Sequence, residues 1–177
     1  KRLMLSAAAA SLLAMPAMAS GGHDKVKIGF VTTITTGAGI IGKDMVDALN
    51  LAMDDMGGKM GGLEVDLIVE DDGFKPGIGK QKTDKLIKQD DVHFITGYLW
   101  SHVLLASRKT ALDSGKFLIS SNAGPSQLAG KLCHNNFFST SWQNDQTPMA
   151  MGEVLNKKGI KSIYVMAPNY AAGKNMV

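Results

Sequence analysis

The stretch VKIGFVTTITTGAGIIGKDMVDALNLAMDDMGG, residues 26–58, decides the fold of this chain. It opens on a short apolar run of the kind that forms a buried strand, and a loop rich in Thr and Gly follows over residues 32–42. Apolar side chains then recur every three or four positions from Val46 to Met56, which predicts a helix that ends at the glycine pair 57–58. A strand, a loop and a helix in this order form the repeating unit of an α/β protein.

The same alternation continues through the next part of the chain. Further strands are predicted over residues 63–69, 92–96 and 117–120, with helices over 80–89 and 101–114 between them. Four strands separated by helices give a parallel sheet with helices on both faces. The predicted fold class is therefore α/β with a Rossmann-like parallel sheet.

The last third of the sequence is less regular. Residues 122–146 carry no clear periodicity and are rich in Asn, Gln, Ser and Gly. A helix is predicted over 147–158, where Thr147 is expected to cap it, and a strand is predicted over 160–167. A loop and the first turn of another helix follow over 169–177, so we expect the sequence to be a piece of a longer protein.

Composition and charge exclude some classes of function. The sequence has 177 residues, of which 45% are hydrophobic and 20% are charged, as in an ordinary globular protein. The formal net charge is +3, and Lys1 and Arg2 supply two of these charges. No basic block with interleaved aromatic residues is present, which makes nucleic acid a poor partner.

The first residues have the pattern of an export signal. Two basic residues precede an apolar, Ala-rich run over residues 3–15, and an A-x-A cleavage signal stands at 17–19. We expect residues 1–19 to be a signal peptide and the mature protein to begin at Ser20 in the periplasm. A membrane anchor is the alternative, but a span needs about 20 apolar residues and this run is shorter.

The glycines of the first loop resemble two nucleotide-binding motifs. Residues 37–42 fit G-x-G-x-x-G, and Lys43 almost completes a P-loop. A P-loop requires Ser or Thr after the lysine, whereas Asp44 stands here, and a dinucleotide fingerprint should follow its strand at once. We favour the alternative, in which these glycines let the loop turn sharply and approach a ligand closely.

Candidates for catalysis and for metal binding are weak. The carboxylates of residues 70–72 could serve acid–base catalysis or a cation site, but a solvated loop at a strand end is the favoured interpretation. The four histidines have no metal-ligand spacing, and no residue stands in the context of an activated nucleophile. We therefore expect no enzyme, no metal and no cofactor.

The topology predicts where a small molecule would bind. In parallel sheets, ligands lie beyond the carboxyl ends of the strands, which here are the loops 32–42, 71–77, 97–101 and 121–125. In the third of these loops, Ser101 stands at the expected start of a helix, where free N–H groups can hold a ligand carboxylate. Alternatively, Ser101 only caps its own helix.

The order of these motifs resembles the branched-chain amino acid binding proteins, which are periplasmic binding proteins of ABC importers. The resemblance rests on the T-G-x-x-x-x-G loop from Thr36 to Gly42, the glycines of 57–62, the Asp71-Asp72 pair and the G-x-x-x-S segment 97–101. It covers roughly residues 25–177. It implies a two-lobed protein with a ligand cleft between the lobes.

The division of the chain into lobes also follows from the resemblance. Residues 20–138 would be the N-terminal ligand-binding lobe, and residues 139–177 would begin a second lobe that is incomplete here. The loop that contains Thr36 would lie at the cleft.

The resemblance also implies roles for individual residues. Ser101 would receive the ligand carboxylate, and Asn122, Ala123 and Gly124 would contribute backbone and side-chain contacts. Tyr170, in the early second lobe, would cover the ligand.

One departure from the family pattern concerns the ligand. Amino acid binders usually carry Thr at the position of Gly124, where its hydroxyl helps to hold the α-ammonium group. Trp100 is placed either to line the cleft or to pack in the core, and an aromatic wall beside a carboxylate seat suits an aromatic or other organic acid.

The resemblance therefore predicts a monomeric solute receptor that delivers an amino acid or a small carboxylate to an ABC permease in the inner membrane. Two alternatives are a ligand sensor of the same fold and a periplasmic enzyme that works through Asp71 and Asp72.

Overall fold

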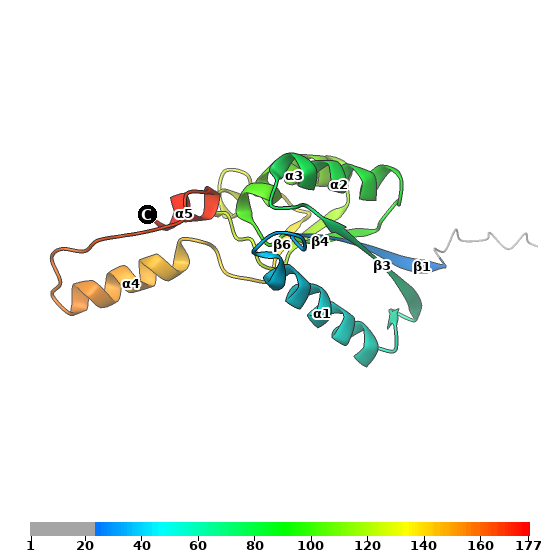
Figure 1. The fold of residues 1–177 in the computed structure, drawn as a ribbon, viewed down its shortest axis with the longest axis horizontal. Helices are drawn as coiled ribbons and strands as arrows, with labels where there is room; N and C mark the ends of the chain where they lie inside the picture. The colour runs from blue at the N-terminus through cyan, green and yellow to red at the C-terminus, as the bar shows by residue number, and fades with distance from the viewer. Residues whose placement is uncertain (1–23) are drawn as a thin grey trace, which may run out of the picture.

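A computed structural model describes residues 24–177 as a six-stranded sheet with helices on both of its faces (Figure 1). The predicted signal peptide lies outside these residues. The strands are β1 Lys25–Thr32, β2 Lys59–Met60, β3 Leu63–Asp71, β4 Phe94–Gly97, β5 Phe117–Ser120 and β6 Phe137–Ser139. The helices are α1 Gly39–Asp55, α2 Pro76–Lys88, α3 Ser101–Asp113, α4 Gln146–Lys157 and α5 Ala171–Met176, with a short 3₁₀ helix η1 at Ser126–Ala129.

The sheet has the order β2-β3-β1-β4-β5-β6, with β1 in its interior. β1 pairs in parallel with both β3 and β4, and β5 and β6 continue the parallel ladder. Only β2 runs antiparallel to its neighbour among the described strands, because it forms a tight hairpin with β3. The α/β fold with a largely parallel sheet is thus confirmed.

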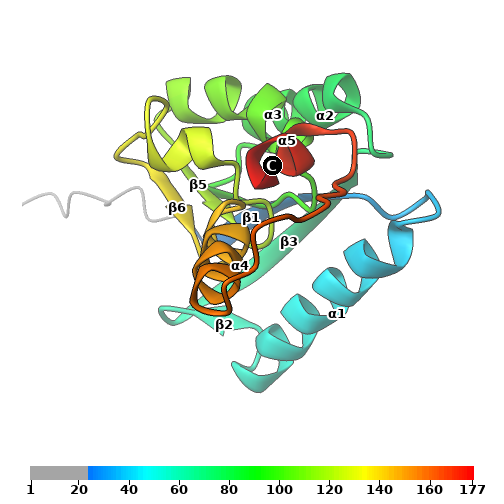
Figure 2. The same ribbon diagram turned by 90° about the vertical axis from the view of Figure 1, so that its left-hand side faces the viewer.

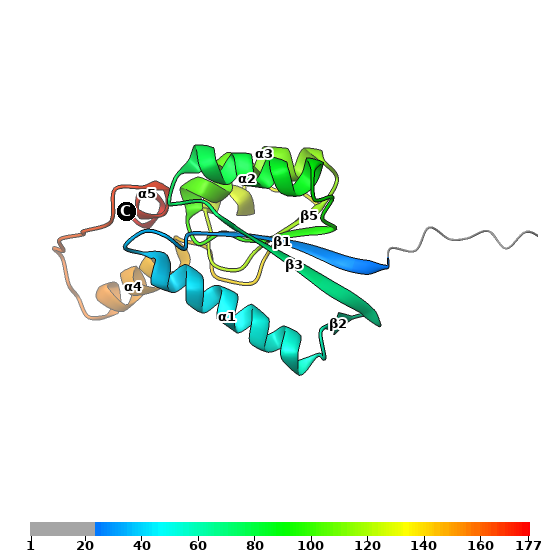
Figure 3. The same cartoon turned by 45° about the vertical axis from the view of Figure 1, so that its right-hand side comes forward.

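The core lies between the sheet and the pair α2 and α3, whereas α1 runs along the other side of the sheet (Figure 3). Leu86, Ile95, Leu104 and Leu118 are completely buried in this core. Each such side chain stabilises the fold by about 1.5–3 kcal/mol relative to an exposed position. This buried core therefore fixes the carboxyl ends of the parallel strands.

Two helix starts and one cap residue differ from the predictions for local reasons. α2 begins at Pro76 rather than at residue 80, because proline fits the first helical position, where no N–H partner is needed. α3 begins with Ser101 inside the helix, and Trp100 takes the cap position without a side-chain capping bond. α4 begins at Gln146, one residue before the predicted cap.

The prediction of a strand over residues 160–167 is wrong. This segment is extended, but no strand pairs with it in the part of the chain that the structure describes, and Tyr164 is 92% exposed. An extended segment becomes a strand only when a neighbouring strand supplies hydrogen-bond partners. α4, which precedes it, extends away from the sheet (Figure 1), whereas α5, which follows it, packs beside α3 (Figure 2).

The end of β4 approaches the end of β1 too closely for any side chain. Gly97 has a φ of 100°, and a Cβ placed on it would lie 2.4 Å from the carbonyl oxygen of Val31. The next residue, Tyr98, donates its N–H to the same oxygen at 2.6 Å. Glycine is therefore required where the chain leaves the sheet toward Trp100.

Replacing Gly97 with Ala should lower the free energy of unfolding by more than about 3 kcal/mol, since both backbone strain and a steric clash oppose it. The matched control is Gly115→Ala, which has a φ of 76° but open space around its Cβ position. The Gly115→Ala variant should lower the free energy of unfolding by only about 1 kcal/mol. Urea unfolding of both variants in the full-length protein measures the difference, and equal losses would contradict the steric argument.

Candidate ligand-binding site

The site is built on loops at the carboxyl ends of the strands, and Asp71 at the end of β3 organises the first of them. Its carboxylate accepts hydrogen bonds from the N–H of Ile34 at 2.8 Å, from the N–H of Gly73 at 3.0 Å and from the hydroxyl of Thr35. Partial burial would raise the pKa of Asp71, but these hydrogen bonds outweigh it and lower the pKa. Asp71 thus ties the loop after β1 to the loop after β3.

The neighbouring carboxylates are also part of the fold rather than of a solvated loop, so that prediction is wrong. Asp72 is completely buried, and it accepts hydrogen bonds from the Thr33 hydroxyl and from the N–H of Phe74. Burial raises the pKa of Asp72 despite these bonds. Glu70 forms ion pairs with Lys82 and Lys85 of α2.

Two glycines of the first loop, Gly39 and Gly42, pack against their own chain. A Cβ on Gly39 would lie 2.1 Å from the carbonyl oxygen of Ile34, and one on Gly42 would lie 1.8 Å from that of Thr33. These glycines let the start of α1 lie directly on the loop that Asp71 holds. Packing within the protein explains the spacing of these glycines, so a nucleotide-binding role is not needed to explain it.

Four aromatic rings meet beyond these loops and form what we call the aromatic cluster: Phe74, Trp100, His102 and Tyr170. The ring of Phe74 lies 4.9 Å from Trp100 and 4.7 Å from His102, and Tyr170 lies 5.6 Å from Trp100 and 5.4 Å from His102. Most of these contacts are edge-to-face, the favourable arrangement for aromatic pairs. Phe74 is held at a φ of 67°, a strained value of the kind that gathers at functional sites.

A pocket of about 490 Å³ opens beside this cluster. This volume lies within the range of small-molecule sites. Among the described residues that line it, Lys75 is the charged one and the rest are mostly apolar. The lining consists of Thr36, Ala38, Gly73, Phe74, Lys75, Trp100, Pro168 and Tyr170.

The pocket brings together three of the residues predicted from the sequence: Thr36, Trp100 and Tyr170. Phe74 and Lys75 were missed, although they lie in the 71–77 loop that the topology had marked for ligands. The sequence feature that could have identified them is an aromatic residue followed by a basic residue in the loop after a strand end.

The other predicted residues lie behind the wall of this pocket. Ser101 is only 2% exposed, and its hydroxyl accepts a hydrogen bond from the side chain of Asn144 at 3.1 Å. The side chain of Asn122 donates to the carbonyl of Leu99 at 2.8 Å, and the N–H of Ala123 donates to Tyr98 at 3.0 Å. These residues fix the loop that carries Trp100.

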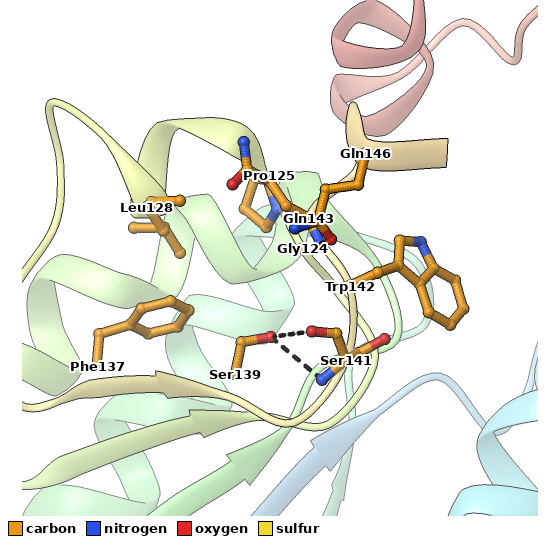
Figure 4. Close-up of a pocket in the computed structure, with 10 residues that line it drawn as sticks. Gly124, Pro125, Leu128, Phe137, Ser139, Ser141, Trp142, Gln143 and Gln146 are labelled. Atoms are coloured by element: carbon orange, nitrogen blue, oxygen red, sulfur yellow. Dashed lines mark hydrogen bonds between the residues drawn. The ribbon is translucent and has the colours of Figure 1, made fainter. Parts of the chain in front are cut away.

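Gly124 lies against the segment that leads from β6 to α4, and this contact explains why no Thr stands there. A Cβ on Gly124 would lie 1.9 Å from the carbonyl oxygen of Trp142. Figure 4 shows a smaller pocket of about 220 Å³ at this place, with Leu128 and Phe137 on one side and Trp142 on the other. A side chain larger than hydrogen would push the two segments apart.

No group of three or more His, Cys, Asp and Glu side chains within residues 24–177 is arranged to hold a metal ion. None of the helices described there combines the length and the apolar character that crossing a membrane requires.

Comparison with known proteins places this geometry in a family. Residues 25–177 match the family described as periplasmic binding protein. The chain belongs to the periplasmic binding protein family. The predicted resemblance is thereby confirmed, and the family is one of solute-binding receptors.

Solved structures of solute-binding proteins of ABC transporters share the fold. One from Rhodopseudomonas palustris BisB5, in complex with 3,4-dihydroxybenzoic acid, is 26% identical over 87% of this chain, with a TM-score of 0.80. Another from R. palustris, in complex with benzoate, is 30% identical over 86% of this chain, with a TM-score of 0.81. The chain spans 42% of the length of each of these two proteins.

An amino acid binder shares the fold at a greater distance. The substrate-binding protein of a branched-chain amino acid transporter from Streptococcus pneumoniae, in complex with isoleucine, is 20% identical over 76% of this chain. The chain covers 38% of that protein, and the TM-score is 0.68. No curated protein matches this chain.

Replacing Asp71 with Ala should lower the free energy of unfolding by about 1–3 kcal/mol at pH 7, because the loop loses hydrogen bonds to a charged group. The folded pKa of Asp71 lies below its ordinary value, so this contribution is present above the unfolded pKa and is lost as pH falls through the folded pKa. The gap between wild type and variant should therefore shrink below about pH 4. Denaturant titrations at pH 7 and pH 3 measure it, and a gap of constant size would exclude the ionised carboxylate as its source.

Proposed function

We propose that this chain forms part of a periplasmic solute receptor of an ABC importer, and that its ligand is a small aromatic carboxylate. The observation that carries the proposal is the pocket in which Phe74, Trp100 and Tyr170 supply aromatic walls and Lys75 supplies a positive charge. The benzoates in the R. palustris relatives support the same class of ligand. The amino acids and aliphatic carboxylates that the sequence also allowed become the competing ligands in the test below.

The chemistry of the pocket favours an aromatic acid over an amino acid. A planar ring can pack against the aromatic walls, and the ammonium group of Lys75 can attract the carboxylate. An amino acid would also need an acceptor for its α-ammonium group. No acidic side chain stands among the described residues that line the pocket, and Asp72, which keeps one oxygen without a hydrogen-bond partner, is completely buried outside that lining.

Binding would work by closure of the two lobes. Tyr170 belongs to the segment that follows α4, whereas Phe74 and Trp100 belong to the loops of the first lobe. A ligand that contacts both sides shifts the equilibrium toward the closed form, because only that form makes all the contacts. Ser101, Asn122, Ala123 and Gly124 would support the wall of the pocket from behind.

The remaining parts of the proposal concern the whole protein. The receptor would be exported by cleavage of residues 1–19, act as a monomer and present its closed form to a membrane permease. Residues 20–138 would form the first lobe, and residues 139–177 would begin the second. The protein would catalyse no reaction. The named relatives are transporter proteins, which favours import over signalling.

A thermal-shift comparison on the full-length mature protein tests the ligand class. Benzoate and 4-hydroxybenzoate should raise the unfolding midpoint, since a ligand of the native state at 100 times its Kd adds about 2.7 kcal/mol. Cyclohexanecarboxylate is the matched control, with the same acid group on a ring that is not aromatic, and it should give a smaller shift. A shift with isoleucine alone would overturn the aromatic proposal.

Replacing Lys75 with Met should weaken benzoate binding by about fivefold, the equivalent of about 1 kcal/mol for an exposed charge pair. Met keeps the apolar stem and removes only the charge. The control is Lys109→Met near the far end of α3, where the lysine pairs with Asp113 on the surface. Calorimetric titration at low salt should separate the two variants, and equal affinities would remove Lys75 from the site.

A further inference from the structure

His102 lies behind the aromatic walls of the pocket and is not among the residues that line it. Its side chain leaves the first turn of α3, two positions after Trp100. The centroid of its ring lies 4.7 Å from that of Phe74 and 5.4 Å from that of Tyr170, and both contacts are edge-to-face. One side chain therefore contacts two of the aromatic residues that line the pocket.

His102 also holds the backbone of Phe74. The Phe74 N–H donates to the carboxylate of Asp72 at 2.8 Å, and the Phe74 carbonyl oxygen lies 3.2 Å from Nε2 of His102. Between these two bonds Phe74 has a φ of 67°, in the left-handed region that costs an L-residue about 1–2 kcal/mol. The two hydrogen bonds offset this strain and keep the Phe74 ring at the pocket.

The acceptor determines which ring nitrogen of His102 carries the hydrogen. A carbonyl oxygen can only accept, so Nε2 must be the donor. In the neutral imidazole Nδ1 then has no hydrogen, and it is buried without a hydrogen-bond partner among the described residues. A buried, unpaired nitrogen does not favour any orientation of the ring. The orientation of His102 therefore comes from the bond to Phe74 and from the two ring contacts.

The walls that His102 supports stand nearly at right angles to one another. The ring planes of Phe74 and Trp100 make an angle of 89°, and those of Trp100 and Tyr170 make an angle of 79°. A flat ligand ring can stack on one wall and meet the next with its edge, and both arrangements are favourable between aromatic rings. A saturated ring gains neither of them. The angle between the walls therefore matters for an aromatic ligand and much less for a saturated one.

We infer that His102 is a positioning residue, which holds the Phe74 ring at this angle and so determines the preference of the pocket for aromatic over saturated carboxylates. This inference rests on the proposed function. Without the bond from His102, Phe74 would spend part of its time outside the strained conformation. The apparent affinity for an aromatic ligand falls with the fraction of the protein that is ready to bind it.

The test is calorimetric titration of the full-length receptor with two probes, benzoate and cyclohexanecarboxylate. His102→Leu should weaken benzoate binding by about fivefold, the usual effect of one lost hydrogen bond, and cyclohexanecarboxylate binding by less than about twofold. A general loss of stability would weaken both ligands alike. His102→Gln should keep the wild-type preference, because the amide nitrogen of Gln can take the place of Nε2 and donate to the Phe74 carbonyl.

The matched control is His134→Leu, which changes an exposed histidine in the loop before β6. The Nδ1 of His134 accepts the N–H of Asn136 at 3.1 Å, so this variant also removes one hydrogen bond between an imidazole and the backbone. It should change the affinity for either probe by less than about twofold.

Each outcome decides between the proposals. Equal weakening of both ligands in His102→Leu, or a His102→Gln variant that binds like His102→Leu, would overturn the inference and leave the proposed function standing. If wild type binds neither benzoate nor any other carboxylate, the proposed function fails and the inference fails with it. Should His102→Leu not fold, His102→Asn replaces it, since its shorter amide cannot reach the Phe74 carbonyl, and an unchanged preference in that variant would overturn the inference.

Discussion

The contact on which the rest of the structure depends is the one between the end of β1 and the loop that leaves β4. The carbonyl oxygen of Val31 accepts the N–H of Tyr98 at 2.6 Å, and only glycine fits at the preceding position. Tyr98 is completely buried at a φ of 60°, and its hydroxyl forms a hydrogen bond with Thr83 of α2 at 2.7 Å. Burial raises the pKa of the Tyr98 hydroxyl, which keeps it neutral. Trp100 and Ser101 therefore leave the sheet at a fixed place.

Hydrogen bonds of buried polar groups also fix the opposite wall of the pocket. Asp71 and Asp72 bind backbone N–H groups and threonine hydroxyls in the loops after β1 and β3, and this holds Phe74 at its strained φ. These hydrogen bonds fix both walls, and Tyr170 meets them as the N-terminal cap residue of α5, which packs beside α3. In the proposed function, a ligand that contacts both walls and Tyr170 would favour the closed form of the receptor.

Much of this architecture was predictable because its signals are local. Strand and helix periods identified the parallel sheet, and the rule for strand ends placed Thr36 and Trp100 at the site. The features that the sequence did not predict share a physical cause. Each of them depends on partners that are far away in sequence. Asp71 reaches Ile34 across 37 positions, Ser101 reaches Asn144 across 43, and residues 160–167 find no neighbouring strand in the described chain. No local pattern records such pairings.

The aromatic pocket is the central claim, and the two tryptophans of this sequence, Trp100 and Trp142, allow a direct test. Trp100 lines the aromatic pocket, and Trp142 lines the smaller pocket beside Gly124. The measurement is tryptophan fluorescence of the full-length receptor during titration with benzoate, in the variants Trp142→Phe and Trp100→Phe. The account predicts a saturable change in Trp142→Phe, where Trp100 alone reports within the first lobe, and little change in Trp100→Phe. A saturable change that follows Trp142 instead would place the ligand elsewhere and contradict the account.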